Sequence, residues 1–261
     1  MSSSTASSRP VALVTGGGRR LGRAIALDLA AHGFDVAVHY RASENEALAT
    51  VAELQSLGAT AFAFQADLSI EAACRALLPA VAAHFKRIDA VVNNASTFEY
   101  DHPATFSVAA MDQHWRANTA PAVLLAQALH SHLNGCAEIG CVVNIIDQKL
   151  WNPNPDYFSY TLSKAALQAA TVMLAQALAP QVRVCGVAPG ITLASGTMNE
   201  TEFAAAHRMT PLQRSSTPED IAHAVRFLIE SPAITGTTLL VDGGQHLSAQ
   251  ARDVLYLAKN S

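Results

Sequence analysis

A glycine-rich segment near the start of the sequence constrains the fold more than any other feature. An apolar run at residues 11–14 leads directly into TGGGRRLG at residues 15–22, and a segment with helical apolar spacing follows. Glycines between a strand and a helix let backbone amides approach a pyrophosphate at the helix N-terminus. A tight strand-to-helix turn also uses glycine, but three consecutive glycines and a fourth at the helix start exceed what a turn needs. The segment therefore predicts a dinucleotide site, with cofactor contacts at Gly16, Gly18, Arg20, Leu21 and Gly22.

The remaining sequence alternates between strand-like and helix-like segments. With 261 residues, half of them hydrophobic, the chain has the size of one α/β domain with an ordinary core. Strand-like apolar runs lie at 11–14, 36–38, 61–64, 90–92, 142–146, 182–187 and 238–241. Such alternation implies βαβ units and a parallel sheet. We predict a single doubly wound α/β domain over residues 10–261, with a seven-stranded parallel sheet flanked by helices.

Two helix starts carry a recognisable signal. Ser43 and Thr217 are each followed three residues later by a carboxylate, Glu46 and Asp220 respectively. This spacing is typical of a hydroxyl that caps a helix N-terminus. We therefore expect a capped helix after each hydroxyl.

Two segments are expected to lie outside regular structure. Residues 1–9 are polar and Ser-rich and predict a disordered tail. Residues 190–214 are rich in Thr, Ser and Met and are too long for an ordinary connection, which favours a substrate lid over an irregular surface excursion. Within this lid, four apolar or hydroxyl side chains either line a pocket or pack against the body: Thr192, Leu193, Met198 and Met209.

Charge and cysteine usage narrow the class of partner. The net charge is −4 with both signs interspersed, which argues against a nucleic-acid footprint or a polybasic membrane patch. No segment has the apolar length of a secretory signal or a membrane span, and the four cysteines lack metal-ligand spacing. We expect a cytoplasmic protein with reduced thiols, no metal and a small-molecule partner. An apolar group near the C-terminus, residues 254–257, suggests burial against a neighbouring subunit.

The end of the second predicted strand indicates which dinucleotide binds. Residues 38–43, VHYRAS, carry no Asp or Glu where a carboxylate would bind both ribose hydroxyls of NAD. Arg41 and the Ser43 hydroxyl, helped by Arg20, offer charge-assisted donors to a 2′-phosphate. We therefore expect NADPH as cofactor, although Arg41 could be a solvated charge and Ser43 a simple cap.

The adenine end of the same site is expected between the second and third strands. Asp67, after the third strand, is placed to accept the adenine amino group, and Leu68 follows it. Tyr40 is expected at the same corner. A helix-start aspartate is the alternative for Asp67.

The chemistry-bearing residues cluster around the fifth predicted strand and the helix after it. Asp147 stands thirteen residues before Tyr160, and Lys164 follows four residues later. A tyrosine and a lysine four apart share one helix face, so the ammonium is expected to lower the pKa of the phenol toward neutrality. At the end of its strand, Asp147 can supply a second titratable oxygen beside the phenol. A capping or salt-bridging carboxylate is the alternative for Asp147.

Taken together, these motifs resemble the short-chain dehydrogenase/reductase superfamily over roughly residues 10–247. The resemblance is carried by the glycine segment, NNA at 93–95, Asn118, Tyr160 with Lys164, PG at 189–190 and DGG at 242–244. It implies an NAD(P)-binding Rossmann domain and usually a homotetramer. It also implies that Lys164 holds the nicotinamide ribose and that Asn118 helps to order a proton-relay water. Further cofactor contacts that it implies are Asn94, Ala95, Ser96, Tyr160, Pro189 and Gly190.

Three departures from the common superfamily pattern point to one branch. Arg20 and Ser96 replace glycines, and Asp147 replaces the usual catalytic serine. With the stretch NASTF at 94–98, these departures resemble the pteridine reductases, a branch that includes bacterial dihydromonapterin reductases. The resemblance implies NADPH-dependent reduction of 7,8-dihydropterins, with dihydrofolate as a further candidate substrate.

The chemistry of the residues agrees with a pterin. An ionised Asp147 beside Tyr160 would repel the alkoxide that forms from a ketone, whereas a pterin accepts hydride at carbon while a ring nitrogen takes a proton. Phe98 would stack on the flat bicycle, and Ser96 with Arg20 would hydrogen-bond its amino-pyrimidinone edge. For Phe98, a core aromatic is the alternative. Two other functions stay open: a carbonyl reductase acting on a ketone, sugar or acyl thioester, and an NADPH-binding protein without turnover.

Overall fold

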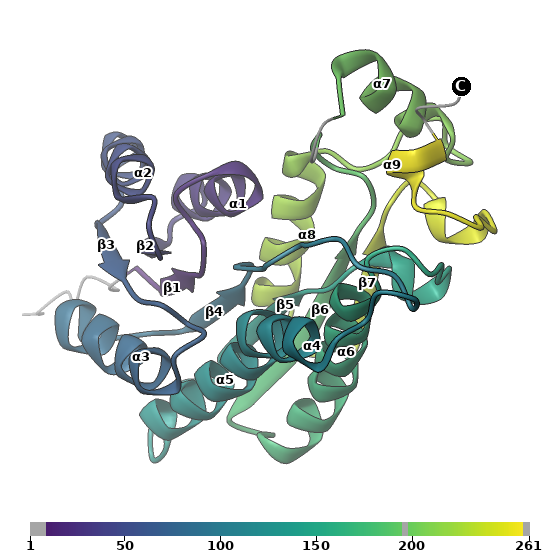
Figure 1. The fold of residues 1–261 in the computed structure, drawn as a ribbon. Helices are drawn as coiled ribbons and strands as arrows, with labels where there is room; N and C mark the ends of the chain where they lie inside the picture. The colour runs from purple at the N-terminus through teal and green to yellow at the C-terminus, as the bar shows by residue number, and fades with distance from the viewer. Residues whose placement is uncertain (1–8, 195–197, 258–261) are drawn as a thin grey trace, which may run out of the picture.

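A single parallel sheet forms the centre of the molecule (Figure 1). The computed structural model describes residues 9–194 and 198–257. In these residues the strand order is β3-β2-β1-β4-β5-β6-β7, and every neighbouring pair is parallel, as the sequence predicts. The strands are β1 (Val11–Val14), β2 (Asp35–Tyr40), β3 (Ala61–Gln65), β4 (Ala90–Asn93), β5 (Gly140–Ile145), β6 (Val182–Pro189) and β7 (Thr238–Val241).

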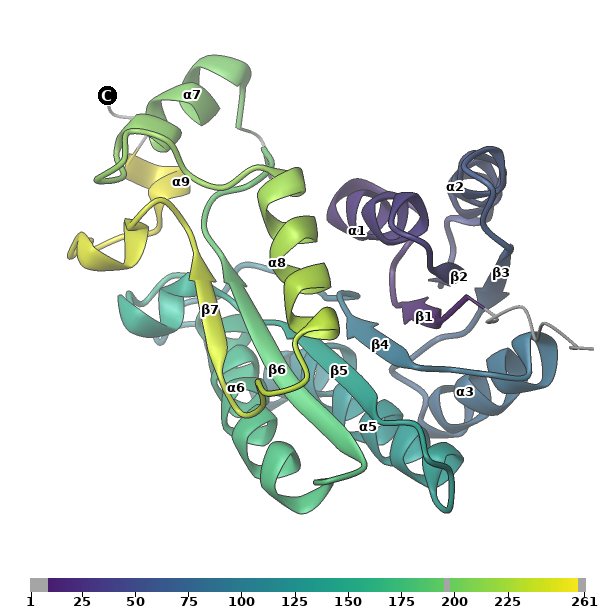
Figure 2. The ribbon, with the colours of Figure 1, turned by 180° about the vertical axis from the view of Figure 1, so that it is seen from behind.

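Helices cover both faces of this sheet (Figures 1 and 2). One face carries α1 (Arg20–Ala31), α2 (Glu44–Ser56) and α8 (Pro218–Glu230), and the other carries α3 (Glu71–Phe85), α5 (Ala120–Leu133) and α6 (Phe158–Ala177). Central strands are therefore buried on both sides, which is why they read as unbroken apolar runs instead of alternating patterns. The shorter elements are α4 (Val108–His114), η1 (Trp115–Thr119), η2 (Gln148–Trp151), α7 (Glu200–Arg208), η3 (Gln245–Leu247) and α9 (Val254–Leu257).

From β1 the chain adds strands to one side of the sheet (β2, β3) and then to the other side (β4 to β7), so the order reverses between β1 and β4. This reversal positions the site. In an open α/β sheet, ligands bind beyond the carboxyl ends of the strands at such a point. Thr15 and Asn94 follow the two strands and are joined there: the Thr15 hydroxyl accepts the amides of Asn94 and Ala95 at 2.9 and 3.0 Å. The Asn94 side chain donates to the Thr15 carbonyl at 2.9 Å.

Of the two predicted helix caps, one is confirmed and one is wrong. Thr217 forms a reciprocal capping box with Asp220 at the start of α8. Ser43 precedes α2 but makes no capping hydrogen bond. Its ψ of 64° departs from the extended backbone that turns a cap side chain toward the helix amides.

The described part of the chain starts at Arg9, one residue before the predicted start of the domain. Residues 1–8 lie outside the described part of the chain, so their expected disorder stays a prediction. Arg9, which we expected in the tail, is bound to the body. Its guanidinium donates to the carbonyls of Gly58 and Ala30, each at 2.8 Å, and approaches the Asp35 carboxylate at 3.3 Å.

The long segment 190–214 contains regular structure. It includes α7, which begins with a capping box formed by Asn199 and Glu202. A small apolar cluster joins this segment to α9, whose Val254 and Leu255 are buried within the same chain. The interpretation of residues 254–257 as a contact for a neighbouring subunit is therefore wrong for these two side chains. The adjacent α7 buries them because it lies directly over α9 (Figure 1).

Candidate active site

An elongated cavity of about 530 Å³ lies where the strand order reverses. Its walls come from the segments that follow β1, β2, β3 and β4, which is why residues far apart in sequence meet there. The sequence-predicted cofactor residues in its wall are Gly16, Arg20, Leu21, Gly22, Tyr40, Arg41, Ser43, Asp67, Leu68, Asn94, Ala95 and Ser96.

The glycine segment is packed too tightly to hold side chains. A Cβ on Gly22 would lie 2.1 Å from the Gly16 carbonyl oxygen, and a Cβ on Gly18 would lie 2.9 Å from the Ala47 Cα. Gly16 itself has a φ of +63°. The loop therefore turns sharply and brings its backbone against the cavity, as a pyrophosphate site requires. Gly18 serves this packing against α2 and does not line the cavity.

His39, to which sequence reasoning assigned no role, holds this loop in place. Its Nδ1 accepts the Gly16 amide at 3.1 Å, and its Nε2 donates to the Ala66 carbonyl at 3.0 Å. Burial lowers the pKa of His39, which favours the neutral ring that this pair of bonds requires. A histidine near the end of an otherwise apolar strand is the sequence signal for such a role.

The expected phosphate corner is open and carries donors. Arg41 is exposed, and the Ser43 hydroxyl is not used for capping, so both are available at the N-terminus of α2. A helix N-terminus itself attracts anions. Glu46 lines the same cavity, and its negative charge opposes a phosphate there.

Asp67 and Tyr40 have local partners at the adenine end. The Asp67 carboxylate accepts the amide and hydroxyl of Ser69 at 3.0 and 2.6 Å, and these bonds, the hydroxyl foremost, lower its pKa. The helix-start alternative for Asp67 is wrong, because α3 begins at Glu71 with Ile70 at its cap. Tyr40 is buried and donates to Glu44 at 3.3 Å.

Asp147 and Tyr160 meet as the sequence spacing predicts. The Tyr160 hydroxyl donates to Asp147 Oδ2 at 2.8 Å. The other carboxylate oxygen of Asp147 accepts the Lys149 amide at 2.9 Å and thereby caps η2. Asp147 is therefore at once the hydrogen-bond partner of Tyr160 and the cap of η2, and its catalytic role stays a prediction.

Burial sets the protonation of this pair, and one prediction about it is wrong. Burial, together with the charge and hydrogen bond of Asp147, raises the pKa of Tyr160 well above its ordinary value. We expected Lys164 to lower this pKa. Instead, the Lys164 ammonium donates to the Ile145 carbonyl at 2.7 Å and lies 5.6 Å from the centre of the Tyr160 ring.

The two other titratable groups of the centre also respond to burial. Burial lowers the pKa of Lys164 to about 8, and the charge of Asp147 acts in the opposite direction. Burial raises the pKa of Asp147, against the hydrogen bonds from the Lys149 amide and Tyr160 and the charge of Lys164. Tyr160 therefore keeps its proton across the neutral range and can serve as a proton donor.

Asn118 ties the substrate side of the site to α6. Its side-chain oxygen accepts the Thr97 amide at 2.7 Å and the Ser96 hydroxyl at 3.1 Å. Its side-chain nitrogen donates to the Thr97 carbonyl and the Ser163 hydroxyl, each at 3.0 Å. These four bonds fill the capacity of a side-chain amide. A relay water ordered by Asn118 would therefore have to be held by its backbone.

Phe98 faces open space, so the alternative of a core aromatic is wrong. Its ring stacks on Tyr157 with centroids 4.0 Å apart and meets Tyr160 edge-on at 4.7 Å. The side chain is 41% exposed. The exposed part of the ring lines a cavity together with Tyr160, where an aromatic side chain can contact a flat ligand.

A second cavity of about 280 Å³ adjoins the first, and Arg20, Leu21, Asn94 and Ser96 line both. It brings together the predicted residues Phe98, Asp147, Tyr160, Lys164, Pro189, Gly190, Thr192 and Leu193. Met198 and Met209 pack in the cluster with α9 instead. Sequence reasoning missed Gln148, Lys149, Gln245, Asp253, Val254 and Leu255, which also line it.

Metal-ligating side chains do not gather within the described residues. No group of three or more His, Cys, Asp or Glu side chains there could hold a metal ion. None of the described helices is long and apolar enough to cross a membrane. The four cysteines carry free thiols; Cys136 is exposed, whereas Cys74, Cys141 and Cys185 are buried.

Known proteins match this chain over most of its length. The model of the enoyl-(acyl carrier protein) reductase family matches residues 17–246. Pteridine reductase 1 of Leishmania tarentolae is 34% identical over 286 residues, which cover 94% of this chain and 99% of that protein. This chain belongs to the short-chain dehydrogenase/reductase family. It is thus an oxidoreductase of that family.

Other short-chain reductases extend the comparison in two directions. A ketoacyl reductase of the granaticin polyketide synthase from Streptomyces violaceoruber is 36% identical over 246 residues, covering 91% of this chain and 96% of that protein. The crystal structure of FolM alternative dihydrofolate reductase 1 from Brucella canis, complexed with NADP, is 40% identical with a TM-score of 0.86. That alignment covers 94% of this chain and 97% of the Brucella chain.

Proposed function

We propose that this short-chain reductase is an NADPH-dependent pterin reductase that converts 7,8-dihydropterins to tetrahydropterins. The observation that carries the proposal is the hydrogen bond between Tyr160 and Asp147, in a cavity that the exposed ring of Phe98 also lines. The similarity to pteridine reductase 1 and to FolM supports it.

The first cavity has the features that NADPH requires. Side chains at Gly18 or Gly22 would collide with the protein backbone, so these glycines let the loop lie against the cavity. Arg41 and Ser43 line the corner where a 2′-phosphate is expected. Lys164 and Tyr160 lie in the adjoining cavity, where the nicotinamide ribose is expected. When bound, NADPH supplies the hydride.

Proton delivery is assigned to Tyr160. Its phenol is neutral in the neutral pH range, and its hydroxyl, which donates to Asp147 here, turns from that carboxylate to the substrate when it gives up its proton. A phenolate formed by donation would face the Asp147 carboxylate at 2.8 Å, so it would be strongly driven to take up a proton again. The nearby Lys164 ammonium limits this repulsion.

Substrate orientation is assigned to Phe98, Ser96 and Arg20. The flat pterin stacks on the exposed face of Phe98 next to Tyr160. Ser96 and Arg20 stand at the border of both cavities, where the Ser96 hydroxyl oxygen can accept from the amino group and Arg20 can donate to the carbonyl of the amino-pyrimidinone edge.

A carbonyl reductase is the second candidate, favoured by the 36% identity to the granaticin ketoacyl reductase. Asp147 is the residue that opposes it. A carboxylate 2.8 Å from the phenol raises the energy of an alkoxide forming at the same place.

Steady-state NADPH oxidation separates these functions. The substrates are 7,8-dihydromonapterin, 7,8-dihydrobiopterin, 7,8-dihydrofolate, biopterin and a panel of ketones, each with NADPH and with NADH. Turnover of dihydropterins in preference to ketones supports the proposal, and the reverse order supports a carbonyl reductase. NADPH binding without consumption of any substrate would indicate a non-catalytic protein.

We also propose that the protein is a homotetramer. Several large apolar side chains on α4, η1 and α6 are exposed in the single chain: Val108, Trp115, Leu162 and Met173. Apolar side chains gathered on neighbouring elements are typical of subunit contacts. Light scattering coupled to size exclusion tests this proposal, and a monomeric mass contradicts it.

A further inference from the structure

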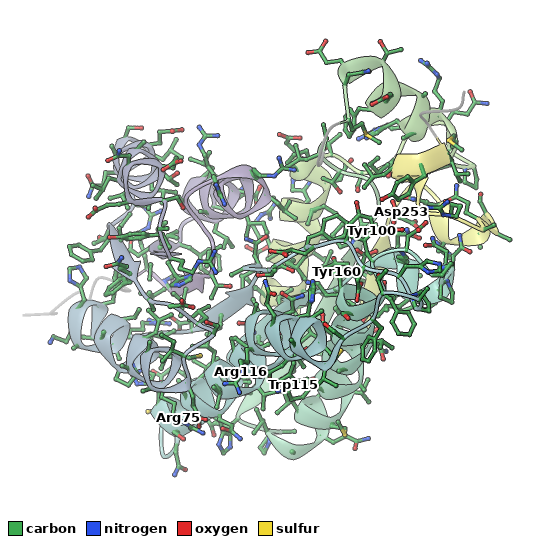
Figure 3. All side chains as sticks on the ribbon, viewed as in Figure 1. Arg75, Tyr100, Trp115, Arg116, Tyr160 and Asp253 are labelled. Carbon is green, nitrogen blue, oxygen red and sulfur yellow. The ribbon has the colours of Figure 1, made fainter. Side chains whose placement is uncertain are left out.

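The segment after η3 folds back over the substrate cavity. From Ser248 onward it crosses to η2, where the Asn152 side chain donates to the Ser248 carbonyl and accepts the Gln250 amide. The segment then passes Asp253, which lies just below α9, at the same end of the molecule as Tyr100 and Tyr160 (Figure 3). Asp253, Val254 and Leu255 form a wall of the 280 Å³ cavity.

A buried carboxylate fixes this segment. Asp156 is fully buried, and its Oδ2 accepts both the Arg252 guanidinium and the Asp253 amide at 2.8 Å. Its Oδ1 accepts the Tyr100 hydroxyl at 3.3 Å. Arg252 also lies 4.6 Å from the centre of the Tyr256 ring. The position of Asp253 is therefore set by contacts on both sides of it.

Asp253 presents a carboxylate beside a buried ammonium. Its Oδ2 accepts Lys149 Nζ at 3.1 Å, and its Oδ1 accepts the Leu255 amide at 3.1 Å. Lys149 also donates to the Asp156 carbonyl at 2.5 Å. A carboxylate has about four acceptor positions and an ammonium three donors, so these bonds leave capacity on both groups. The cavity wall thus offers an acceptor and a donor side by side.

This pair lines the part of the site that does not border the first cavity. Ser96 and Arg20 line both cavities, whereas Asp253 and Lys149 line only the second. A pterin whose amino-pyrimidinone edge is held by Ser96 and Arg20 therefore directs its C6 side chain toward Asp253 and Lys149. The cavity is slightly smaller than the roughly 300–1,000 Å³ of ordinary ligand pockets. A short side chain fits it better than a long one.

We propose that Asp253 and Lys149 form the subsite for the C6 side chain of the substrate and select a short, uncharged, hydroxylated chain. Adjacent hydroxyls can donate to the carboxylate and accept from the ammonium. The anionic aminobenzoyl-glutamate chain of a folate is longer and meets the negative charge of Asp253. The inference rests on the proposed pterin reductase function.

Substitution of Asp253 tests the subsite. Asp253→Asn keeps a side-chain oxygen for the Leu255 amide but removes the charge, and we expect the KM for 7,8-dihydromonapterin to rise about tenfold with little change in kcat. The KM for 7,8-dihydrofolate is expected to stay constant or fall, so the preference between the two substrates narrows. Asp253→Glu restores the charge and is expected to recover part of the preference. Asp112→Asn, which breaks an exposed ion pair with Arg116 on α4 and η1, is the matched control.

A binding measurement separates recognition from turnover. Oxidised monapterin and folate are titrated calorimetrically into the protein saturated with NADP⁺. Asp253→Asn is expected to lower the affinity for monapterin and to leave the affinity for folate unchanged. An equal loss of affinity for both ligands, or no loss of affinity for either, overturns the proposed subsite, while the pterin reductase proposal stands. Absence of NADPH oxidation by the unsubstituted protein with every pterin overturns the proposed function itself. Unfolding temperatures of all variants identify any substitution that acts through folding.

Discussion

The Tyr160 hydroxyl donates to the Asp147 carboxylate at 2.8 Å, although the two residues lie on different elements, one after β5 and the other in α6. The bond directs the phenolic proton to the carboxylate, and burial together with the carboxylate charge raises the pKa of the phenol, so that it keeps its proton at neutral pH. The carboxylate beside this phenol disfavours an alkoxide at the same place.

Removal of the phenolic hydroxyl should abolish most of the turnover. Tyr160→Phe is expected to lower kcat with dihydropterins by about 10²–10⁴-fold, the usual contribution of a positioned acid. NADPH affinity, measured by fluorescence titration, should change little because the glycine segment is untouched. Turnover at the unsubstituted rate would remove Tyr160 from the mechanism.

Removal of the carboxylate charge should change which substrates react. Asp147→Asn is expected to lower kcat with dihydropterins by about tenfold or more, because it removes a charge-assisted hydrogen bond from Tyr160. Asp147→Ser should gain ketone reduction, because a neutral hydroxyl then stands beside the phenol. The check is a comparison of kcat/KM for both substrate classes. Loss of both activities in the serine variant would contradict the charge argument.

The alkaline pH dependence should come from Lys164. Its pKa is about 8, so the ammonium predominates below this pH and is lost as the pH rises through it. The pKa of Tyr160 lies well above the ordinary phenol value, so it does not titrate in the same range. We expect kcat/KM for NADPH, which reports groups of the free enzyme, to fall above about pH 8. Lys164→Met should lose this alkaline limb together with much of its activity, and persistence of the limb would assign it to another group.

The glycine segment at residues 15–22 should not tolerate an added methyl group at Gly22. In Gly22→Ala the new Cβ would lie 2.1 Å from the Gly16 carbonyl oxygen, so the loop has to move. We expect a destabilisation of about 1–3 kcal/mol and a loss of NADPH binding. Ala24→Gly in the same helix should cost about 1 kcal/mol and leave NADPH binding intact. Denaturant unfolding and fluorescence titration measure the two effects, and equal NADPH affinity in both variants would contradict the packing argument.

The preference for a phosphorylated cofactor should depend on Arg41. A charge-assisted hydrogen bond contributes about 1.5–3 kcal/mol, so Arg41→Ala is expected to raise the KM for NADPH roughly tenfold or more. The KM for NADH should stay nearly constant. Arg75→Ala, which removes an exposed partner of Glu71 on α3, is the control. A parallel change for both cofactors in the Arg41 variant would place the 2′-phosphate elsewhere.

Much of the fold could be predicted because local patterns encode it. Buried parallel strands need apolar side chains on both faces, so the central strand β1 was located to the residue. The edge strand β7, which is only half-buried, was located by its short run of strand-forming residues. The capping box at Thr217 could also be predicted, because the two residues that form it lie within one helical turn of each other. The Ser43 cap failed because it depended on a backbone angle that residue types alone do not specify.

The sequence by itself determined the order of the elements, the glycine segment and the spacing that brings Asp147, Tyr160 and Lys164 to one place. Only the tertiary structure decided that the Lys164 ammonium contacts a carbonyl instead of the phenol, and that His39 anchors the glycine loop. It also joined Lys149 to Asp253 across 104 positions of sequence. Local spacing fixes which side chains share a face, whereas contacts between distant segments and the burial that shifts a pKa arise only when the whole chain has packed.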